Sequence, residues 1–207
     1  MRNLASRLGS ADVLGIDLGD PDNAPRVIEE AVSRLGGVDV LINNAGSNDN
    51  VPAIDEETSE FERVLALNLT TPFALCREAA RVMVHSGRGG TIVNIASILG
   101  LVGLGRIPEA GYHASKAGLI NLTRELAAQW ARSGVRVNAL APGWFPSELT
   151  DELFTTENGK EWLRRNTPMG RGGRVEELDG ALLLLASDAS SFMTGQVVVV
   201  DGGWTAV

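Results

Sequence analysis

The hexapeptide at residues 111–116 holds the side chains of this sequence that are best suited to move a proton. Tyr112 and Lys116 stand four residues apart in a segment whose apolar residues predict a long helix. Four residues make about one helical turn, so both side chains leave the same face. A cation roughly 5 Å from a phenol would lower its pKa from about 10 by around two units, or about 3 kcal/mol. The spacing therefore predicts Tyr112 as an acid and base, although an ordinary amphipathic face gives the same pattern.

A second feature is a proline inside a helical pattern. Pro72 follows Asn68 by four residues, with apolar residues at helical spacing on both sides. Proline lacks an N–H, and its ring crowds the carbonyl four residues back. The backbone carbonyl of Asn68 is therefore expected to lack its helical donor, and the helix is expected to be distorted there. A kink without any function remains the alternative.

Composition excludes several classes of function. The 207 residues carry a net charge of −8, which disfavours a nucleic acid or an anionic membrane as partner. The single cysteine, Cys76, cannot form an internal disulfide, and no Cys/His spacing predicts a metal site. No signal peptide or apolar run long enough to span a bilayer is evident, so a cytoplasmic protein is expected.

Short apolar runs alternate with longer amphipathic segments along the chain. Strands are predicted at residues 13–16, 38–42, 91–95, 135–140 and 196–200. Helices are predicted at residues 25–35, from 58 or 59 to about 86, 112–132 and 175–186. This alternation predicts a Rossmann-like three-layer α/β/α fold with a mostly parallel sheet. Ligands of such folds bind at the carboxyl ends of the strands, where most of the polar motifs fall.

These motifs, taken in order, resemble one enzyme family. They are Asn43-Asn44-Ala45-Gly46, Asn68, Asn94-Ile95-Ala96-Ser97, Tyr112 with Lys116, Asn138, and Pro142-Gly143. The pattern resembles the short-chain dehydrogenase/reductase family over about residues 5–203. The resemblance implies hydride transfer between NAD or NADP and an alcohol or carbonyl. It also implies a single, incomplete NAD(P)-binding domain over residues 1–207.

The resemblance assigns catalytic roles to four positions. Ser97 would hold the substrate oxygen, and Tyr112 would be the general acid and base. Lys116 would lower the pKa of the tyrosine and bind the ribose of the nicotinamide. Asn68 would hold, through its carbonyl, a water of a proton relay. For Ser97 taken alone, a serine that merely ends its strand is the alternative.

The resemblance also assigns residues to the cofactor. They are Asp17, Leu18, Asn43, Ala45, Gly46, Tyr112, Lys116, Pro142 and Gly143. Asp17 and Leu18 would contact the adenine, and Pro142 and Gly143 the nicotinamide. Glycine after a strand lets a ligand approach the backbone, as expected for Gly46. A plain turn is the alternative at Asp17 and after residue 43.

The family opens with a strand, a glycine-rich turn, a helix and a second strand, and none of these precedes residue 13. Residues 1–5 already resemble the helix before the third strand, so the edges of the runs at 13–16 and 38–42 are expected to be unpaired. Either a late start codon or a truncated relative would explain the difference. The polypeptide is expected to bind the cofactor poorly and to be barely active. Micromolar binding of NADH or NADPH by the purified protein would contradict this.

The sequence is compatible with three classes of substrate: a sugar acid, another polyol or a 3-oxoacyl thioester. The Ser97–Tyr112 interval is about two residues longer than usual for the family, with the extra residues at 101–110 expected beside the pocket. Residues 145–174 are expected to form a mobile lid. A homo-oligomer, dimer or tetramer, is expected through the two long helices and the last strand. A non-catalytic subunit that pairs with full-length relatives is the alternative function.

Overall fold

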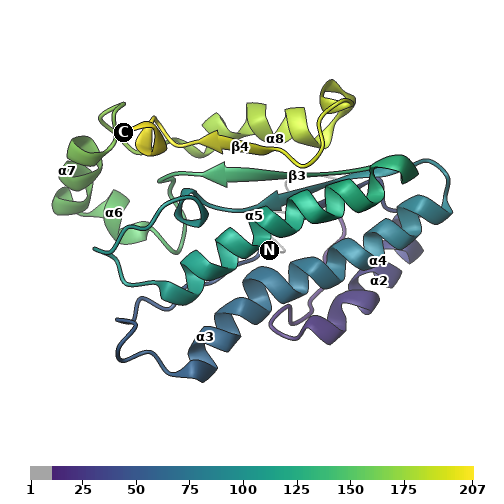
Figure 1. Cartoon of the computed structure of the whole chain (residues 1–207), viewed down its shortest axis with the longest axis horizontal. Coiled ribbons are helices and arrows are strands. Elements are labelled where there is room, and N and C mark those ends of the chain that lie inside the picture. Colours follow the sequence, from purple (N-terminus) through teal and green to yellow (C-terminus); the bar gives the residue numbers. More distant parts are fainter. Residues whose placement is uncertain (1–10) are drawn as a thin grey trace.

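A four-stranded parallel sheet organises the chain, as the computed structural model of residues 11–207 shows (Figure 1). Its strands are β1 (Val40–Asn43), β2 (Gly90–Ile95), β3 (Val135–Pro142) and β4 (Val197–Val200). They lie side by side in sequence order, and each adjacent pair is parallel. All four carboxyl ends therefore meet at one edge of the sheet, as the sequence predicted.

The predicted helices are found, and two short helices that the sequence did not predict lie within residues 145–174. The helices are α2 (Ala24–Leu35), α3 (Thr58–Leu65), α4 (Thr71–His85), α5 (Ala110–Trp130), α6 (Asp151–Thr155), α7 (Glu157–Asn166) and α8 (Asp179–Ala186). A π-helical turn, η2 (Ala66–Thr70), joins α3 to α4, and a short 3₁₀ turn, η3 (Ile98–Gly100), follows β2. Within residues 11–207, no helix has the length and hydrophobicity that crossing a bilayer requires.

Helices lie on both sides of the sheet, which makes the predicted three layers (Figure 1). Successive residues of a strand point to opposite faces, and β2 is buried on both. Ile92 belongs to the core that also contains Met83 of α4 and Leu126 of α5. Val93, the next residue, packs with Leu185 of α8 on the other side. This double burial is why the strands read as continuous apolar runs rather than alternating ones.

The strand predicted at residues 13–16 is absent, and this prediction was wrong. The segment has no regular structure, because in the described part of the chain no neighbouring strand pairs with it. β1 likewise has a paired neighbour on only one side, and its Val40 and Ile42 are 43% and 41% exposed. The expected unpaired edge is thus found at β1. The helix expected at residues 1–5 lies outside the described residues.

The start of β2 depends on a close approach between two glycines. Gly89 has a φ of +71°, and a Cβ there would lie 2.3 Å from the carbonyl oxygen of Gly134. Gly89→Ala should therefore lower the free energy of unfolding by about 3 kcal/mol, through left-handed strain and backbone overlap. Denaturant unfolding measures the change.

Gly87→Ala is the matched control for this substitution. Gly87 has a similar φ of +68°, but no atom lies within 4 Å of a Cβ built there. Its replacement should cost only about 1 kcal/mol. Equal losses in the two variants would show that the contact with Gly134 contributes nothing.

Candidate active site

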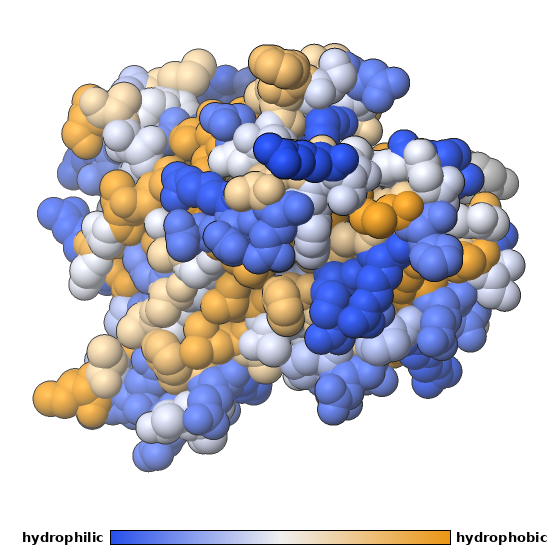
Figure 2. All heavy atoms as spheres, turned by 45° about the vertical axis from the view of Figure 1, so that its right-hand side comes forward, coloured by the Kyte–Doolittle hydropathy of each residue, from blue (hydrophilic) through white to orange (hydrophobic). Residues whose placement is uncertain are grey.

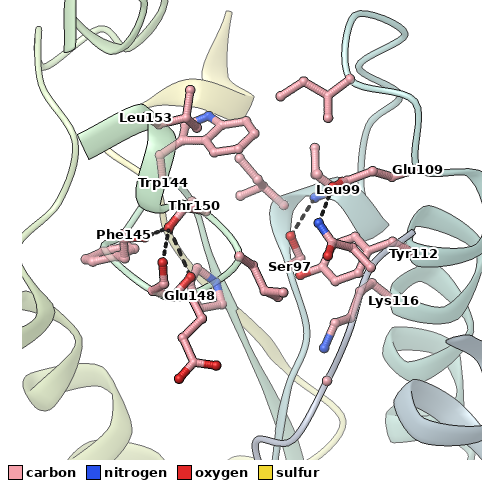
Figure 3. A pocket seen from close by; sticks show the side chains of 18 of the residues that line it. Ser97, Leu99, Glu109, Tyr112, Lys116, Trp144, Phe145, Glu148, Thr150 and Leu153 are labelled. Atoms are coloured by element: carbon pink, nitrogen blue, oxygen red, sulfur yellow. Dashed lines mark hydrogen bonds between the residues drawn. The ribbon is translucent and has the colours of Figure 1, made fainter. Parts of the chain in front are cut away.

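A large cavity opens at the carboxyl ends of the strands, where ligands of parallel α/β folds bind. Its volume is ≈ 1070 Å³. Residues after β1, after β2 and after β3 contribute to its walls, together with the start of α5 and the segment that leads into α6 (Figure 3). Most of the predicted site residues lie in this wall, namely Ala45, Gly46, Ser97, Tyr112, Lys116, Pro142 and Gly143.

Ser97 and Tyr112 face each other across the end of β2. Ser97 is buried where the strand turns into η3, and its Oγ accepts a hydrogen bond from the amide of Leu99 at 3.1 Å. Its hydroxyl also lies near enough to Tyr112 to act against the rise in the pKa of the phenol. The two hydroxyls therefore share one cavity, which is the arrangement that action on a single substrate oxygen requires.

Lys116 lies one helical turn further along α5 and is only 4% exposed. Its Nζ donates a hydrogen bond to the carbonyl oxygen of Ile95 at 2.8 Å and stands 5.5 Å from the centroid of the Tyr112 ring. The ammonium thus points into the site rather than toward bulk water. Burial lowers its pKa to about 8.

The expectation that Lys116 lowers the pKa of Tyr112 was wrong for the site as it stands. The pKa of Tyr112 is raised to about 12, mainly by burial; the Ser97 hydroxyl acts to lower it, and the charge of Glu109 acts to raise it. The spacing argument treated only the attraction between the two groups. Loss of water around a phenolate, which disfavours its charged form, is the largest effect on this pKa.

Asn68 lies behind the cavity wall rather than in it. Its buried side chain donates hydrogen bonds to the Ser47 carbonyl at 2.8 Å and to Ser115 Oγ at 3.0 Å, and accepts one from the Ser47 amide at 2.9 Å. It therefore fastens the segment after β1 to α5. The helix widens into the π turn η2 at this residue, just before Pro72, as the missing proline N–H predicts.

Three predicted cofactor residues do not line the cavity. Asn43 is buried beneath it, where its Nδ2 donates to Asn94 Oδ1 at 2.8 Å. Asp17 accepts a hydrogen bond from the amide of Gly19 at 2.8 Å, which is the turn that was the alternative. The carbonyl of Leu18 accepts from Thr71 Oγ1 at 2.8 Å, and the side chain packs against the core.

Glu109 is a site residue that the sequence analysis missed. It immediately precedes α5, one turn before Tyr112, yet it is only 8% exposed. Its Oε1 accepts a hydrogen bond from Asn48 Nδ2 at 2.6 Å (Figure 3). Burial raises the pKa of this carboxyl above its ordinary value. Its position one turn before Tyr112 was visible in the sequence, but its burial was not.

Aromatic side chains form the far wall. Trp144 stacks edge-on with Trp162 and Trp204, at centroid distances of 5.2 and 5.4 Å. Phe145 follows Trp144 in the cavity lining, and Gly173 lies so close behind its ring that a Cβ there would be 2.3 Å away. The segment predicted as a lid thus contributes to the wall, while its mobility stays a prediction.

The burial of Lys116 has a consequence for stability. Its pKa falls from 10.5 to about 8 in the fold, so between these pH values the unfolded chain binds a proton that the native state lacks. The free energy of unfolding should therefore rise by about 3 kcal/mol across this window. Lys116→Met should be free of that rise, and the exposed Lys160→Met should keep it. Denaturant unfolding from pH 7 to 10 measures the slopes; identical slopes in all three proteins would contradict the burial.

Comparison with known proteins extends these observations. Residues 1–205 match the family model described as enoyl-(acyl carrier protein) reductase. Gluconate 5-dehydrogenase of Gluconobacter oxydans is 43% identical over 146 residues, which cover 70% of this chain and 56% of that protein. The chain thus spans little more than half the length of the first curated relatives that it matches.

Two solved structures resemble the whole described fold. A short-chain type dehydrogenase/reductase from Mycobacterium marinum superposes with a TM-score of 0.92 at 35% identity, covering 100% of this chain and 82% of that one. A gluconate 5-dehydrogenase from Burkholderia cenocepacia, solved with NADP and tartrate, gives a TM-score of 0.91 at 37% identity, covering 99% and 81%. On these matches and the site geometry, this chain belongs to the short-chain dehydrogenase/reductase family.

Proposed function

We propose that this protein is an oxidoreductase that transfers hydride between NAD or NADP and an alcohol or carbonyl substrate. The observation that carries the proposal is the meeting of Ser97, Tyr112 and Lys116 at one cavity. A hydroxyl that holds an oxygen, a phenol that exchanges a proton and an ammonium beside it are the groups that carbonyl reduction requires.

Tyr112 is proposed as the general acid and base. With a pKa of about 12, the phenol holds its proton at neutral pH, which suits donation to a carbonyl oxygen during reduction. Ser97 would bind that same oxygen as negative charge develops on it. Lys116 would assist by placing positive charge below the ring. Asn68, whose backbone carbonyl lies in the π turn before Pro72, would pass protons on toward solvent.

The cavity fits the nicotinamide end of the proposed cofactor. The bound cofactor would supply or accept the hydride. Lys116 and Tyr112 offer an ammonium and a hydroxyl for ribose oxygens on the wall that also contains Ala45 and Gly46, whose small size leaves the backbone accessible. Pro142 and Gly143 would lie against the nicotinamide ring.

Among substrates, a sugar acid is the one that the observations favour. Two of the relatives are named gluconate 5-dehydrogenase, and one was solved with tartrate, a hydroxy acid. The cavity also contains Glu109 and Asn48, which suit hydroxyl groups, and Arg106 at its rim, which suits a carboxylate. A 3-oxoacyl thioester, which the description of the family model suggests, is the competing substrate for the assay.

We also propose a homo-oligomer, dimer or tetramer, formed through the long helices and the last strand. Exposed apolar side chains on these elements support it, namely Phe73 and Val84 of α4 and Val199 of β4. Figure 2 shows hydrophobic side chains reaching the surface in separate areas among hydrophilic ones. Light scattering should give a multiple of the chain mass, and Phe73→Glu on α4 should reduce it while Leu35→Glu on α2 does not. A monomeric wild type would contradict the proposal.

The proposed chemistry predicts the effect of removing one oxygen. Tyr112→Phe should lower hydride transfer at least about 100-fold, because the ring remains but the proton donor is lost. The absorbance of reduced nicotinamide at about 340 nm follows the reaction. The protein is used at micromolar concentration, with D-gluconate, 5-keto-D-gluconate or a 3-oxoacyl thioester as substrate.

The exposed variant His85→Phe is the control and should keep wild-type activity. A Tyr112→Phe protein that retained more than about a tenth of the wild-type rate would refute the assigned role. If the wild type itself transferred no hydride but formed oligomers with a longer relative, the non-catalytic subunit would be the better account.

A further inference from the structure

The position of Glu109 is costly for the fold. It occupies the position just before α5, where a carboxylate could bind free helical amides, but its side chain makes no such capping bond. The side chain turns instead into the cavity wall and is 8% exposed (Figure 3). Glutamate is seldom buried without a compensating partner, because the carboxylate loses its water.

The protein offsets only part of the cost of burying the Glu109 carboxylate. Asn48 donates one hydrogen bond to Oε1, which leaves the second carboxylate oxygen free for another donor. No lysine or arginine within residues 11–207 forms an ion pair with it. Among nearby groups, His113 favours the ionised form of the Glu109 carboxyl, and Asp49 disfavours it. A buried acceptor with spare capacity at a cavity is suited to a ligand that donates a hydrogen bond.

Trp144 also lines this cavity, but its polar atom is not accessible from it. It is 8% exposed, and its indole Nε1 is buried without a hydrogen-bond partner. Trp144 therefore contributes apolar surface to the wall. The free acceptor at Glu109 matches a hydroxyl-bearing ligand, since a hydroxyl can donate a hydrogen bond to it.

We infer that Glu109, held by Asn48, is a specificity-determining residue that accepts a hydrogen bond from a substrate hydroxyl near the reacting carbon. The inference rests on the proposed function, because it places the ligand in the cavity of Ser97 and Tyr112. Glu109 begins the turn that carries Tyr112, so the hydroxyl that it binds lies close to the oxygen that Tyr112 serves. An aliphatic chain at the same place would leave the carboxylate without water or partner, so a polyhydroxylated acid is selected over a fatty acyl group.

Direct binding tests the inference without any need for turnover. D-Gluconate and hexanoate have the same charge and the same number of carbons but differ in their hydroxyls. Trp144 and Trp162 line the cavity and pack against Trp204, so tryptophan fluorescence reports its occupancy. Wild-type protein should bind D-gluconate at least about tenfold more tightly than hexanoate.

Substitutions then assign the preference to Glu109. Glu109→Leu should weaken D-gluconate binding about tenfold or more and leave hexanoate binding unchanged or stronger. Glu109→Gln, which keeps the size and an acceptor oxygen, should restore part of the preference. Glu125→Leu, on the exposed side of the same helix, is the control and should behave as wild type. Circular dichroism checks that each variant is folded.

The outcomes separate this inference from the proposed function. Equal weakening of both ligands in Glu109→Leu would show that the residue merely holds the Asn48 segment in place, and the inference would fail. Wild-type protein without a preference for D-gluconate would also overturn it. Binding with the expected preference but without hydride transfer would leave the inference standing and count against the proposed reaction alone.

Discussion

The hydrogen bond between Lys116 and the carbonyl of Ile95 is the contact on which the site depends. The Nζ of Lys116, on α5, lies 2.8 Å from the carbonyl oxygen of Ile95, the last residue of β2, and the lysine is almost fully buried. Ser97 comes two residues after this carbonyl, and Tyr112 one turn before this lysine. One contact between a helix and a strand therefore sets where both hydroxyls meet. Its cost is the removal of an ammonium from water, which is also why the pKa of Lys116 falls.

Much of the fold could be predicted from the sequence because parallel strands buried on two faces leave a strong apolar signal. The strands β2 and β3 were found in this way. The run at residues 13–16 gives the same signal but forms no strand, because a strand also requires a hydrogen-bonded neighbour. Local pattern alone could not show whether that neighbour was present. A distortion of the helix at Asn68 was predicted, since a missing proline N–H frees the carbonyl four residues earlier; the structure shows that it takes the form of a π turn.

For the site, the sequence predicted which residues come together but not how deeply they are buried. The convergence of Ser97, Tyr112 and Lys116 followed from their order along the chain and from the strand ends that hold them. The pKa of Tyr112 did not follow, because spacing gives a distance but no measure of how much water is excluded. Glu109 was overlooked for a related reason. A glutamate next to Pro108 in a loop is usually solvated, whereas contacts with distant segments, including Asn48, bury this one.

The packing of Gly173 behind the ring of Phe145 lets the size of the cavity be set from outside it. Phe145 belongs to the lining, whereas Gly173 supports the ring from the opposite side. Any side chain larger than hydrogen at residue 173 would displace the Phe145 ring and with it part of the cavity lining. The residue at position 173 therefore sets the size of the cavity without lining it. Family members with identical cavity linings are expected to differ in the length of substrate that they accept if they differ at this position.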